Sequence, residues 1–305
     1  MTTGEPVDGG WAAERWAAEH GLAVAGPGLS AATAVVGVIG SPVRHSLSPL
    51  LHNTAFVHLG IDWVSVGFPV VRGEAAAALA GAHALGVRGL SVTMPHKEDV
   101  AAEVDDRSPE ATRLGAVNCV VAVDGGWRGE NTDGAGFVAA LARGGRFEPA
   151  GRRCLVVGAG GAARAVIAAL GDAGAADVVV VNRSEDRART ATLLAGPVGR
   201  VGSAEEATGC DLVVNATPAG MGDVDGAPGG WPVDPALLRP GQVVVDLVYH
   251  PPITPWLAAA ADRGATTANG LGMLVHQAAL QIELWTGSEA PVDAMWAAVD
   301  DRGTA

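Results

Sequence analysis

Short apolar runs alternate with helical patterns along most of this chain, and glycine or polar turn residues bound each run. The first run, Ala34-Val-Val-Gly-Val-Ile-Gly40, suits a buried parallel strand. More elements follow at the same spacing: strands near 63–69, 91–95, 116–123 and 127–131, and helices near 50–59, 73–85, 98–104 and 109–114. This alternation predicts a mostly parallel sheet with right-handed crossovers.

A second strand–helix series begins at Arg153-Cys-Leu-Val-Val157 and runs to about Asp246. Its predicted strands lie at 153–157, 177–181, 211–214 and 242–246, with a short one near 198–201. From Thr254 onward we expect helices, broken near Asn269 and Gly270. The last of them are a long helix through 277–285 and a short one at 292–299.

Composition narrows the class of partner. The formal net charge is −13, and no basic run is present, so nucleic acid is excluded while a local anion pocket is not. Cys119, Cys154 and Cys210 lie far apart without zinc-type spacing, which predicts no metal and a reducing compartment. No apolar run of about 18 residues and no signal pattern occurs. We therefore expect a soluble, cytoplasmic protein without a membrane partner.

The segment Gly158-Ala-Gly-Gly-Ala-Ala163 follows a predicted strand and opens a predicted helix. Its first glycine permits a tight turn, and its second lets backbone N–H groups approach a pyrophosphate. The helix N-terminus adds partial positive charge there. A glycine pattern alone fits a tight turn in any α/β fold, but this context favours dinucleotide binding by Gly158, Ala159, Gly160, Gly161 and Ala162.

The end of the next strand indicates which dinucleotide binds. Sites for NAD usually carry Asp or Glu there, on the ribose diol. This chain has Val181-Asn-Arg-Ser-Glu-Asp-Arg187, with Asn182 at the acidic position. Arg183 and Arg187 can pair with a 2′-phosphate from one helical turn. The alternative is that both arginines pair with the acidic residues between them. We predict NADP rather than NAD.

The segment Ser91-Val-Thr-Met-Pro-His-Lys97 is typical of a buried strand that ends in a turn presenting one lysine. Proline cannot donate to a sheet ladder, so strand pairing should stop near Pro95. Lys97 then follows the carboxyl end of a strand, where open α/β sheets usually bind ligands. It offers a fixed cation and a proton source. The alternative is a surface lysine that begins a helix.

Other polar residues lie on loops of the same unit. Ser46 and Ser48 follow the first strand, Asn118 ends Gly115-Ala-Val-Asn118, and Asp133 lies in Asn-Thr-Asp-Gly134. Each has an ordinary explanation, because serines favour helix starts and Asn-Thr-Asp-Gly is common in turns. Together with the lysine they supply hydroxyls, an amide, an ammonium and a carboxylate. Such a set suits a small polyhydroxylated acid.

Eight segments share an order and a spacing that are more specific than any one of them. They are 40–49 with His52 and Asn53, 91–97, 115–118, 131–134, 158–164, 182–184, 215–221 and 270–277. In this combination the chain, over about residues 35–290, resembles the shikimate dehydrogenase family. The resemblance implies reversible, NADP-dependent reduction of 3-dehydroshikimate to shikimate, a step of the chorismate pathway to aromatic amino acids.

The resemblance also implies a role for each matching residue. Ser46 and Ser48, with Tyr249, would hold the substrate carboxylate; Thr93, Asn118 and Gln277 would contact ring hydroxyls; Lys97 and Asp133 would form the catalytic pair near the C3 oxygen. On the cofactor side it adds Ser184, Thr217, Met221, Leu247 and Gly270 to the glycine turn and the arginines. Ser91 and His96 depart from common family residues. The sequence leaves open which member of the pair transfers the proton.

Two alternative functions stay open. One is a relative that accepts quinate or aminoshikimate, depending on the room beside Ser46 and Ser48. The other is a non-catalytic nucleotide-sensing Rossmann protein, which the presence of Lys97 and Asp133 disfavours.

The expected fold is α/β with two domains after an extension at 1–33, which repeats Trp-Ala-Ala-Glu at Trp11 and Trp16. A substrate-binding catalytic domain would comprise 34–133 and 270–305, and a Rossmann NADP-binding domain would comprise 134–269. We expect a monomer or homodimer that acts on a small molecule.

Overall fold

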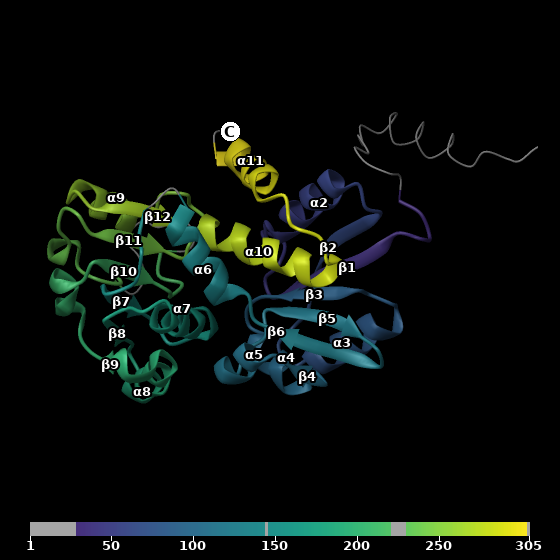
Figure 1. The fold of residues 1–305 in the computed structure, drawn as a ribbon, viewed down its shortest axis with the longest axis horizontal. Coiled ribbons are helices and arrows are strands. Elements are labelled where there is room, and N and C mark those ends of the chain that lie inside the picture. The colour runs from purple at the N-terminus through teal and green to yellow at the C-terminus, as the bar shows by residue number, and fades with distance from the viewer. Residues whose placement is uncertain (1–28, 144–145, 221–229, 304–305) are drawn as a thin grey trace, which may run out of the picture.

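The structure, a computed structural model, describes residues 29–143, 146–220 and 230–303, and these form two six-stranded sheets. Figure 1 shows the sheets on opposite sides of two helices, α6 (Asp133–Ala142) and α10 (Leu271–Thr286), which run between them. The predicted α/β class is confirmed. The Trp-Ala-Ala-Glu repeats and Met221 lie outside the described residues.

The first sheet has the strand order β2-β1-β3-β5-β6-β4. Its strands are β1 (Ala34–Gly40), β2 (Trp63–Pro69), β3 (Gly89–Val92), β4 (Asp106–Arg107), β5 (Cys119–Val123) and β6 (Gly126–Glu130). Strands β2, β1 and β3 are parallel, whereas β5 is antiparallel to β3 and forms a hairpin with β6. Strand β4 was not predicted, because its two residues are polar and exposed and show no apolar pattern.

Helices cover both faces of this sheet. One face packs against α3 (Ala75–Ala84), α4 (Lys97–Glu103) and α5 (Pro109–Leu114), with Leu90 and Val92 of β3 in the core between them. The other face packs against α2 (Ser48–Leu59), α10 and α11 (Val292–Gly303), around Phe56 and Ile282. Residues from the end of the chain thus lie against the first strands.

The second sheet is entirely parallel and has the order β12-β11-β10-β7-β8-β9. Its strands are β7 (Arg153–Val157), β8 (Asp177–Val181), β9 (Gly199–Val201), β10 (Leu212–Asn215), β11 (Val243–Asp246) and β12 (Thr266–Asn269). Its helices are α7 (Gly161–Asp172), α8 (Glu185–Thr192) and α9 (Pro255–Asp262), with 3-10 turns at Leu193–Val198, Ala204–Gly209 and Pro235–Leu237. In the described ranges no helix is long and apolar enough to cross a bilayer.

The prediction of continuous helix from Thr254 to Asn269 is wrong. Helix α9 ends at Asp262, Gly264 turns with a φ of +80°, and the chain then enters the edge strand β12. Only one edge of β12 pairs, and its sequence Thr-Thr-Ala-Asn is partly exposed, so no apolar run marks it. The predicted break before the last long helix is correct, since α10 begins at Leu271.

The end of α5 directs the chain toward the polar residues. Ser108 caps the helix by accepting a hydrogen bond from the N–H of Ala111 at 3.2 Å, and Pro109 occupies the first turn, where its missing N–H costs nothing. Gly115 ends the helix in the left-handed conformation that glycine adopts readily. The next residues lead straight into β5, so Asn118 lies where that strand begins.

Helices α6 and α10 approach each other closely at Gly136. A β-carbon there would lie 2.6 Å from the backbone nitrogen of Gln277 and 2.9 Å from its α-carbon. Backbone atoms cannot move aside as a flexible side chain can, so only glycine permits this approach. It brings the first turn of α6, with Asp133, beside the middle of α10.

We expect Gly136→Ala to lower the free energy of unfolding by about 1–3 kcal/mol, because the new methyl group forces the two helices apart. Urea unfolding measures this change. Gly81→Ala is the matched control, since Gly81 also lies within a helix and a β-carbon there meets nothing within 4 Å. The control should be neutral or stabilising by up to about 1 kcal/mol. Equal effects of the two substitutions would contradict the close approach.

Candidate active site

Lys97 begins α4 and forms an ion pair with Asp133, the first residue of α6. Strand β3 ends at Val92, earlier than predicted, and a turn of four residues carries the chain to Lys97. The alternative prediction was a surface lysine that begins a helix. Lys97 does begin a helix, but it does not lie at the surface. Its side chain is only 17% exposed, and that of Asp133 is 5% exposed. Burial makes each charge depend on the other.

Lys97 is the only lysine of the chain, whose 20 basic residues are otherwise arginines. An arginine guanidinium stays protonated in proteins, whereas a lysine ammonium is compact and can release a proton. The one position with lysine chemistry is therefore also the one that contacts the buried carboxylate.

Asn118 holds the second oxygen of the same carboxylate. Its Nδ2 donates to Oδ1 of Asp133 at 2.7 Å and to Oε1 of Gln277 at 3.3 Å, and its Oδ1 accepts from the backbone N–H of Thr132 at 2.7 Å. All of these groups are buried. The carboxylate of Asp133 thus receives an ammonium on one oxygen and an amide on the other, which fixes its plane.

The serine loop lies at the same edge of the sheet as the lysine turn. Strands β1 and β3 are parallel neighbours, and the N–H of Ser41 donates to the carbonyl of Met94 at 2.9 Å, which ties the two loops together. Within the loop, the hydroxyl of Ser46 accepts from the N–H of Ser48 at 3.3 Å. Ser48 is buried, and Ser46 and Thr93 are half-buried.

Tyr249 reaches this loop from the second sheet. It follows β11, and its phenol lies by the backbone of Leu47, between the two serines. Burial raises the pKa of Tyr249, and the hydrogen bond with the Leu47 backbone partly opposes this. The structure therefore brings together the three residues predicted to hold a carboxylate.

The glycine turn lies against the lysine. Gly158 has a φ of 122°, and a β-carbon there would be 2.9 Å from the carbonyl oxygen of Ala216, so the turn tolerates no side chain. Gly160 precedes α7, and Gly161 is its first residue. A β-carbon on Gly161 would lie 3.5 Å from Cδ of Lys97. The predicted dinucleotide turn and the predicted catalytic lysine thus lie beside each other.

The residues after β8 fit a phosphate better than a ribose diol. Asn182 donates from Nδ2 to the carbonyl of Ser184 at 2.9 Å, and Ser184 caps α8 by accepting from the N–H of Arg187 at 3.4 Å. Arg183 and Arg187 are exposed. Over the described ranges neither forms an ion pair, whereas Glu185 pairs with a third arginine, Arg189. The predicted alternative, arginines neutralised by their acidic neighbours, does not describe this turn.

A buried hydrogen-bond network lies at the carboxyl ends of β10 and β11 in the second sheet. Asn215 accepts from the hydroxyl of Thr217 at 2.7 Å and donates to Asp246 at 2.9 Å, and burial raises the pKa of Asp246. Leu247 follows β11, and a β-carbon on Gly270 would lie 2.1 Å from its carbonyl oxygen. Thr217, Leu247 and Gly270 therefore follow three adjacent parallel strands at one edge, as a nucleotide site requires.

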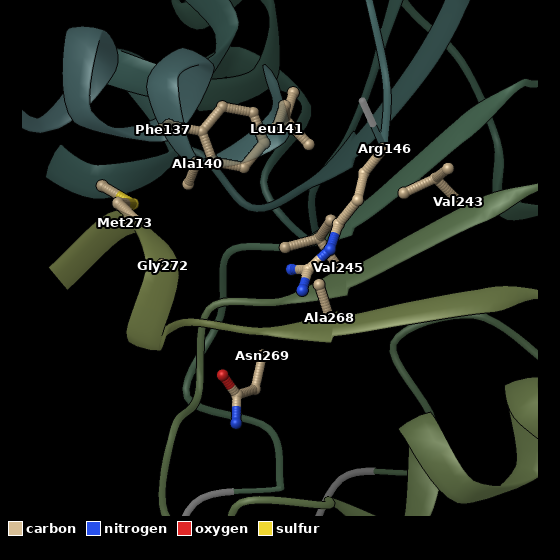
Figure 2. A pocket seen from close by; sticks show the side chains of 10 residues that line it. All are labelled: Phe137, Ala140, Leu141, Arg146, Val243, Val245, Ala268, Asn269, Gly272 and Met273. Carbon is tan, nitrogen blue, oxygen red and sulfur yellow. The ribbon is translucent and has the colours of Figure 1, made fainter. Parts of the chain in front are cut away.

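A small cavity lies beside Gly270, lined by Asn269 before it and Gly272 after it. Figure 2 shows it between α6, the first turn of α10 and the strands β11 and β12, with Arg146 pointing into it. Its volume is about 20 Å³, room for a water molecule and not for a sugar ring or a nucleotide. No group of three or more His, Cys, Asp or Glu side chains suited to a metal was found among the described residues.

Comparisons with known proteins agree on one family. Residues 38–120 match the shikimate dehydrogenase substrate binding domain, 141–217 match shikimate / quinate 5-dehydrogenase, and 270–299 match the shikimate 5′-dehydrogenase C-terminal domain. A shikimate dehydrogenase (NADP(+)) of Moorella thermoacetica is 47% identical over 88% of this chain and 92% of its own length. The chain belongs to the shikimate dehydrogenase family.

Solved structures of the family share the fold. Shikimate 5-dehydrogenase from Thermus thermophilus, in complex with NADP(H) and shikimate, has a TM-score of 0.81 and 38% identity, covering 88% of this chain and 99% of that one. Quinate dehydrogenase from Corynebacterium glutamicum, in complex with NAD, has a TM-score of 0.78 and 32% identity, with 88% and 99% covered. The resemblance predicted from the motifs is confirmed.

Three residues of the site were given no role from sequence, although two of them, His52 and Thr132, lie in or beside the matching segments. Thr132 donates its hydroxyl to the carbonyl of Gln277 at 3.1 Å, and Gln281 donates to Oε1 of Gln277 at 2.8 Å. His52 lies against Gln281. For Gln281 the sequence did contain a signal. It lies four residues after Gln277, so the two side chains share one face of the helix.

Tyr249 is the only tyrosine of the chain, so its ionisation can be followed by phenolate absorbance alone. We expect a midpoint above about 10 in the folded protein, because burial beside Leu47 disfavours the phenolate. The same protein in denaturant should titrate near about 10, and Tyr249→Phe should remove the signal. A folded midpoint at or below the denatured one would contradict the packing of Tyr249 against the serine loop.

Proposed function

We propose that this protein is an NADP-dependent dehydrogenase that interconverts 3-dehydroshikimate and shikimate. The observation that carries the proposal is the buried ion pair of Lys97 and Asp133, with the Lys97 side chain beside the glycine turn at Gly161. A hydroxyl or ketone bound at this pair lies next to the place where a dinucleotide would bind. Relatives named shikimate dehydrogenase (NADP(+)) at 40–47% identity support the same substrate and cofactor.

The chemistry of each group suits one end of the substrate. In our proposal the hydroxyls of Ser46, Ser48 and Tyr249 donate to its carboxylate, since together they supply three neutral donors without a competing charge. Thr93, Asn118 and Gln277 contact its ring hydroxyls. The bonds from Asn118 to Asp133 and Gln277 support this, because they tie the three polar groups into one surface.

The ion pair performs the proton chemistry. Reduction of the ketone places negative charge on its oxygen, and the ammonium of Lys97 stabilises that charge from a fixed position. A proton reaches the same oxygen as the charge develops, delivered from Lys97 or from a hydroxyl bound to Asp133. Asp133 orients the ammonium and accepts a hydrogen bond from a substrate hydroxyl. Bound NADP supplies or accepts the hydride.

The cofactor site fits NADP by charge. Asn182 lacks the negative charge that would repel a 2′-phosphate, and the exposed guanidinium groups of Arg183 and Arg187 can pair with it. The other proposed contacts come from the turn and the strand ends: Gly158, Ala159, Gly160, Gly161, Ala162, Ser184, Thr217, Leu247 and Gly270. Met221 belongs to the same proposal but lies outside the described residues.

We further propose that residues 34–133 with 270–305 form the catalytic domain and 134–269 the cofactor domain. The packing of α10 and α11 against α2 supports this division. Cys119, Cys154 and Cys210 are buried free thiols, which fits a cytoplasmic enzyme. We propose a monomer or homodimer.

Initial rates with shikimate, quinate and aminoshikimate, each with NADP and with NAD, test the proposed function. We expect the highest kcat/KM with shikimate and NADP. A preference for quinate would favour the alternative function, a quinate dehydrogenase. The 32% identity to the quinate dehydrogenase of Corynebacterium glutamicum supports testing it. Comparable kcat/KM with NADP and NAD would contradict the role of the two arginines. No shikimate turnover with either cofactor would overturn the proposal.

We expect Lys97→Ala and Asp133→Ala each to lower kcat by about 10²–10⁴. The first removes the stabilising ammonium and a proton donor, and the second removes the carboxylate that orients the ammonium and takes part in the proton path. Lys97→Arg separates charge stabilisation from proton transfer, because arginine keeps the positive charge but does not release a proton. Steady-state kinetics measures the loss, and Arg128→Gln is a control that breaks a partly exposed ion pair with Glu130. Near-normal turnover in both alanine variants would refute the assignment of the pair.

A further inference from the structure

Gln281 is a fully buried polar side chain one turn beyond Gln277 on α10. Its Nε2 donates to Oε1 of Gln277 at 2.8 Å and to the backbone oxygen of Asn118 at 3.1 Å. Both partners are acceptors, so the nitrogen of the Gln281 amide must face them. Its Oε1 therefore points away, and it has no partner within hydrogen-bond distance among the described residues.

The group beyond that oxygen is His52 of α2, which is also fully buried. Its Nδ1 lies 2.9 Å from the hydroxyl of Ser65, while its Nε2, like Oε1 of Gln281, has no bond of standard geometry within the described part of the chain. Burial lowers the pKa of His52 to about 3, so the ring is neutral and carries one N–H. The two unpartnered atoms are complementary if that N–H is on Nε2, with Nδ1 accepting from Ser65.

Asn53 fixes the position of Ser65, which lies at the end of this hydrogen-bond series farthest from the ion pair. The N–H of Ser65 donates to Oδ1 of Asn53 at 2.7 Å, and its carbonyl accepts from Nδ2 of Asn53 at 2.9 Å. Residues of α2 and β2 thus hold Ser65, Ser65 holds His52, and His52 faces Gln281. The series continues through Gln277 and Asn118 to the carboxylate of Asp133.

We propose that Gln281 and His52 are positioning residues that fix the direction of the Gln277 amide, and so its polarity toward the substrate. Oε1 of Gln277 is occupied from inside by Gln281 and Asn118, and one N–H of its Nε2 donates to the carbonyl of Leu274 at 2.8 Å. The remaining N–H can only donate. A ring hydroxyl at this point must accept from Gln277, and its own proton is then directed to an acceptor such as Asp133. This inference rests on the proposed function.

Gln242 is the matched control that distinguishes a positioning role of Gln281 from a purely structural one. That side chain is also fully buried, and its Nε2 donates to the backbone oxygens of Ala207 and Cys210 at 2.6 and 2.8 Å. Both of those partners belong to the second sheet and its connections, away from the ion-pair network. Loss of the Gln281 amide removes two hydrogen bonds. Loss of the Gln242 amide removes three, because its Oε1 also accepts from the N–H of Arg239 at 2.7 Å, but only Gln281 connects to the site.

The kinetic test compares Gln281→Leu with Gln242→Leu. We expect Gln281→Leu to raise KM for shikimate about tenfold, with KM for NADP within about twofold and kcat within about threefold of the wild type. Gln242→Leu should lower Tm without changing either KM. An unchanged KM for shikimate in folded Gln281→Leu, or the same rise in both variants, overturns the proposal.

A second pair of variants tests His52 directly. His52→Gln keeps an amide N–H near the position of Nε2, whereas His52→Asn keeps a polar group only on the Nδ1 side. We expect KM for shikimate to stay near the wild-type value in His52→Gln and to rise in His52→Asn. Equal values in the two variants overturn the role of Nε2.

A measurement of the His52 tautomer in the wild-type protein does not depend on turnover. Nitrogen NMR of the imidazole should show His52 as the neutral Nε2–H tautomer from about pH 5 to pH 8, with the signal assigned by its absence in His52→Gln. An Nδ1–H tautomer or a charged ring overturns the hydrogen-bond series. Wild-type protein inactive on shikimate but with this tautomer would instead mean that the proposed function fails.

Discussion

The carboxylate of Asp133 is the point on which the site depends. It receives the ammonium of Lys97 on one oxygen and the amide of Asn118 on the other, and all three side chains are largely buried. A buried charge without partners costs several kcal/mol, so α4, the start of β5 and the start of α6 must meet in one arrangement. The close approach of α6 and α10 at Gly136 then adds Gln277 to the same group.

Sequence predicted most of this arrangement, and its errors have physical causes. The buried parallel strands were found because apolar runs mark them, whereas the polar edge strands β4 and β12 carry no such pattern. Lys97 and Asp133 were predicted because they follow strands and match a family, and Asn118 because it matches the family. His52 was matched only as part of a family segment, without a role, and Gln281 was not singled out. A buried polar residue within a helix shows its purpose only once its partners, distant in sequence, are known.

The protein carries a formal charge of −13, and yet its proposed substrate and cofactor are both anions. Local chemistry resolves this contrast. Two exposed arginines, backbone N–H groups at a helix start and a set of hydroxyls each offer donors at one place, so the overall charge does not decide what binds. The hydroxyl set is shared between the two units, because Tyr249 follows a strand of one and Ser46 a strand of the other. Carboxylate binding would therefore also hold the two units together.

The single lysine has a consequence for handling the protein. A reagent selective for primary amines has only one side-chain target in this sequence, Lys97. Attachment to a resin or coupling of a dye through a lysine side chain would therefore modify the ion pair itself. The rate at which an amine reagent labels Lys97 therefore measures how well a bound ligand shields its ammonium group.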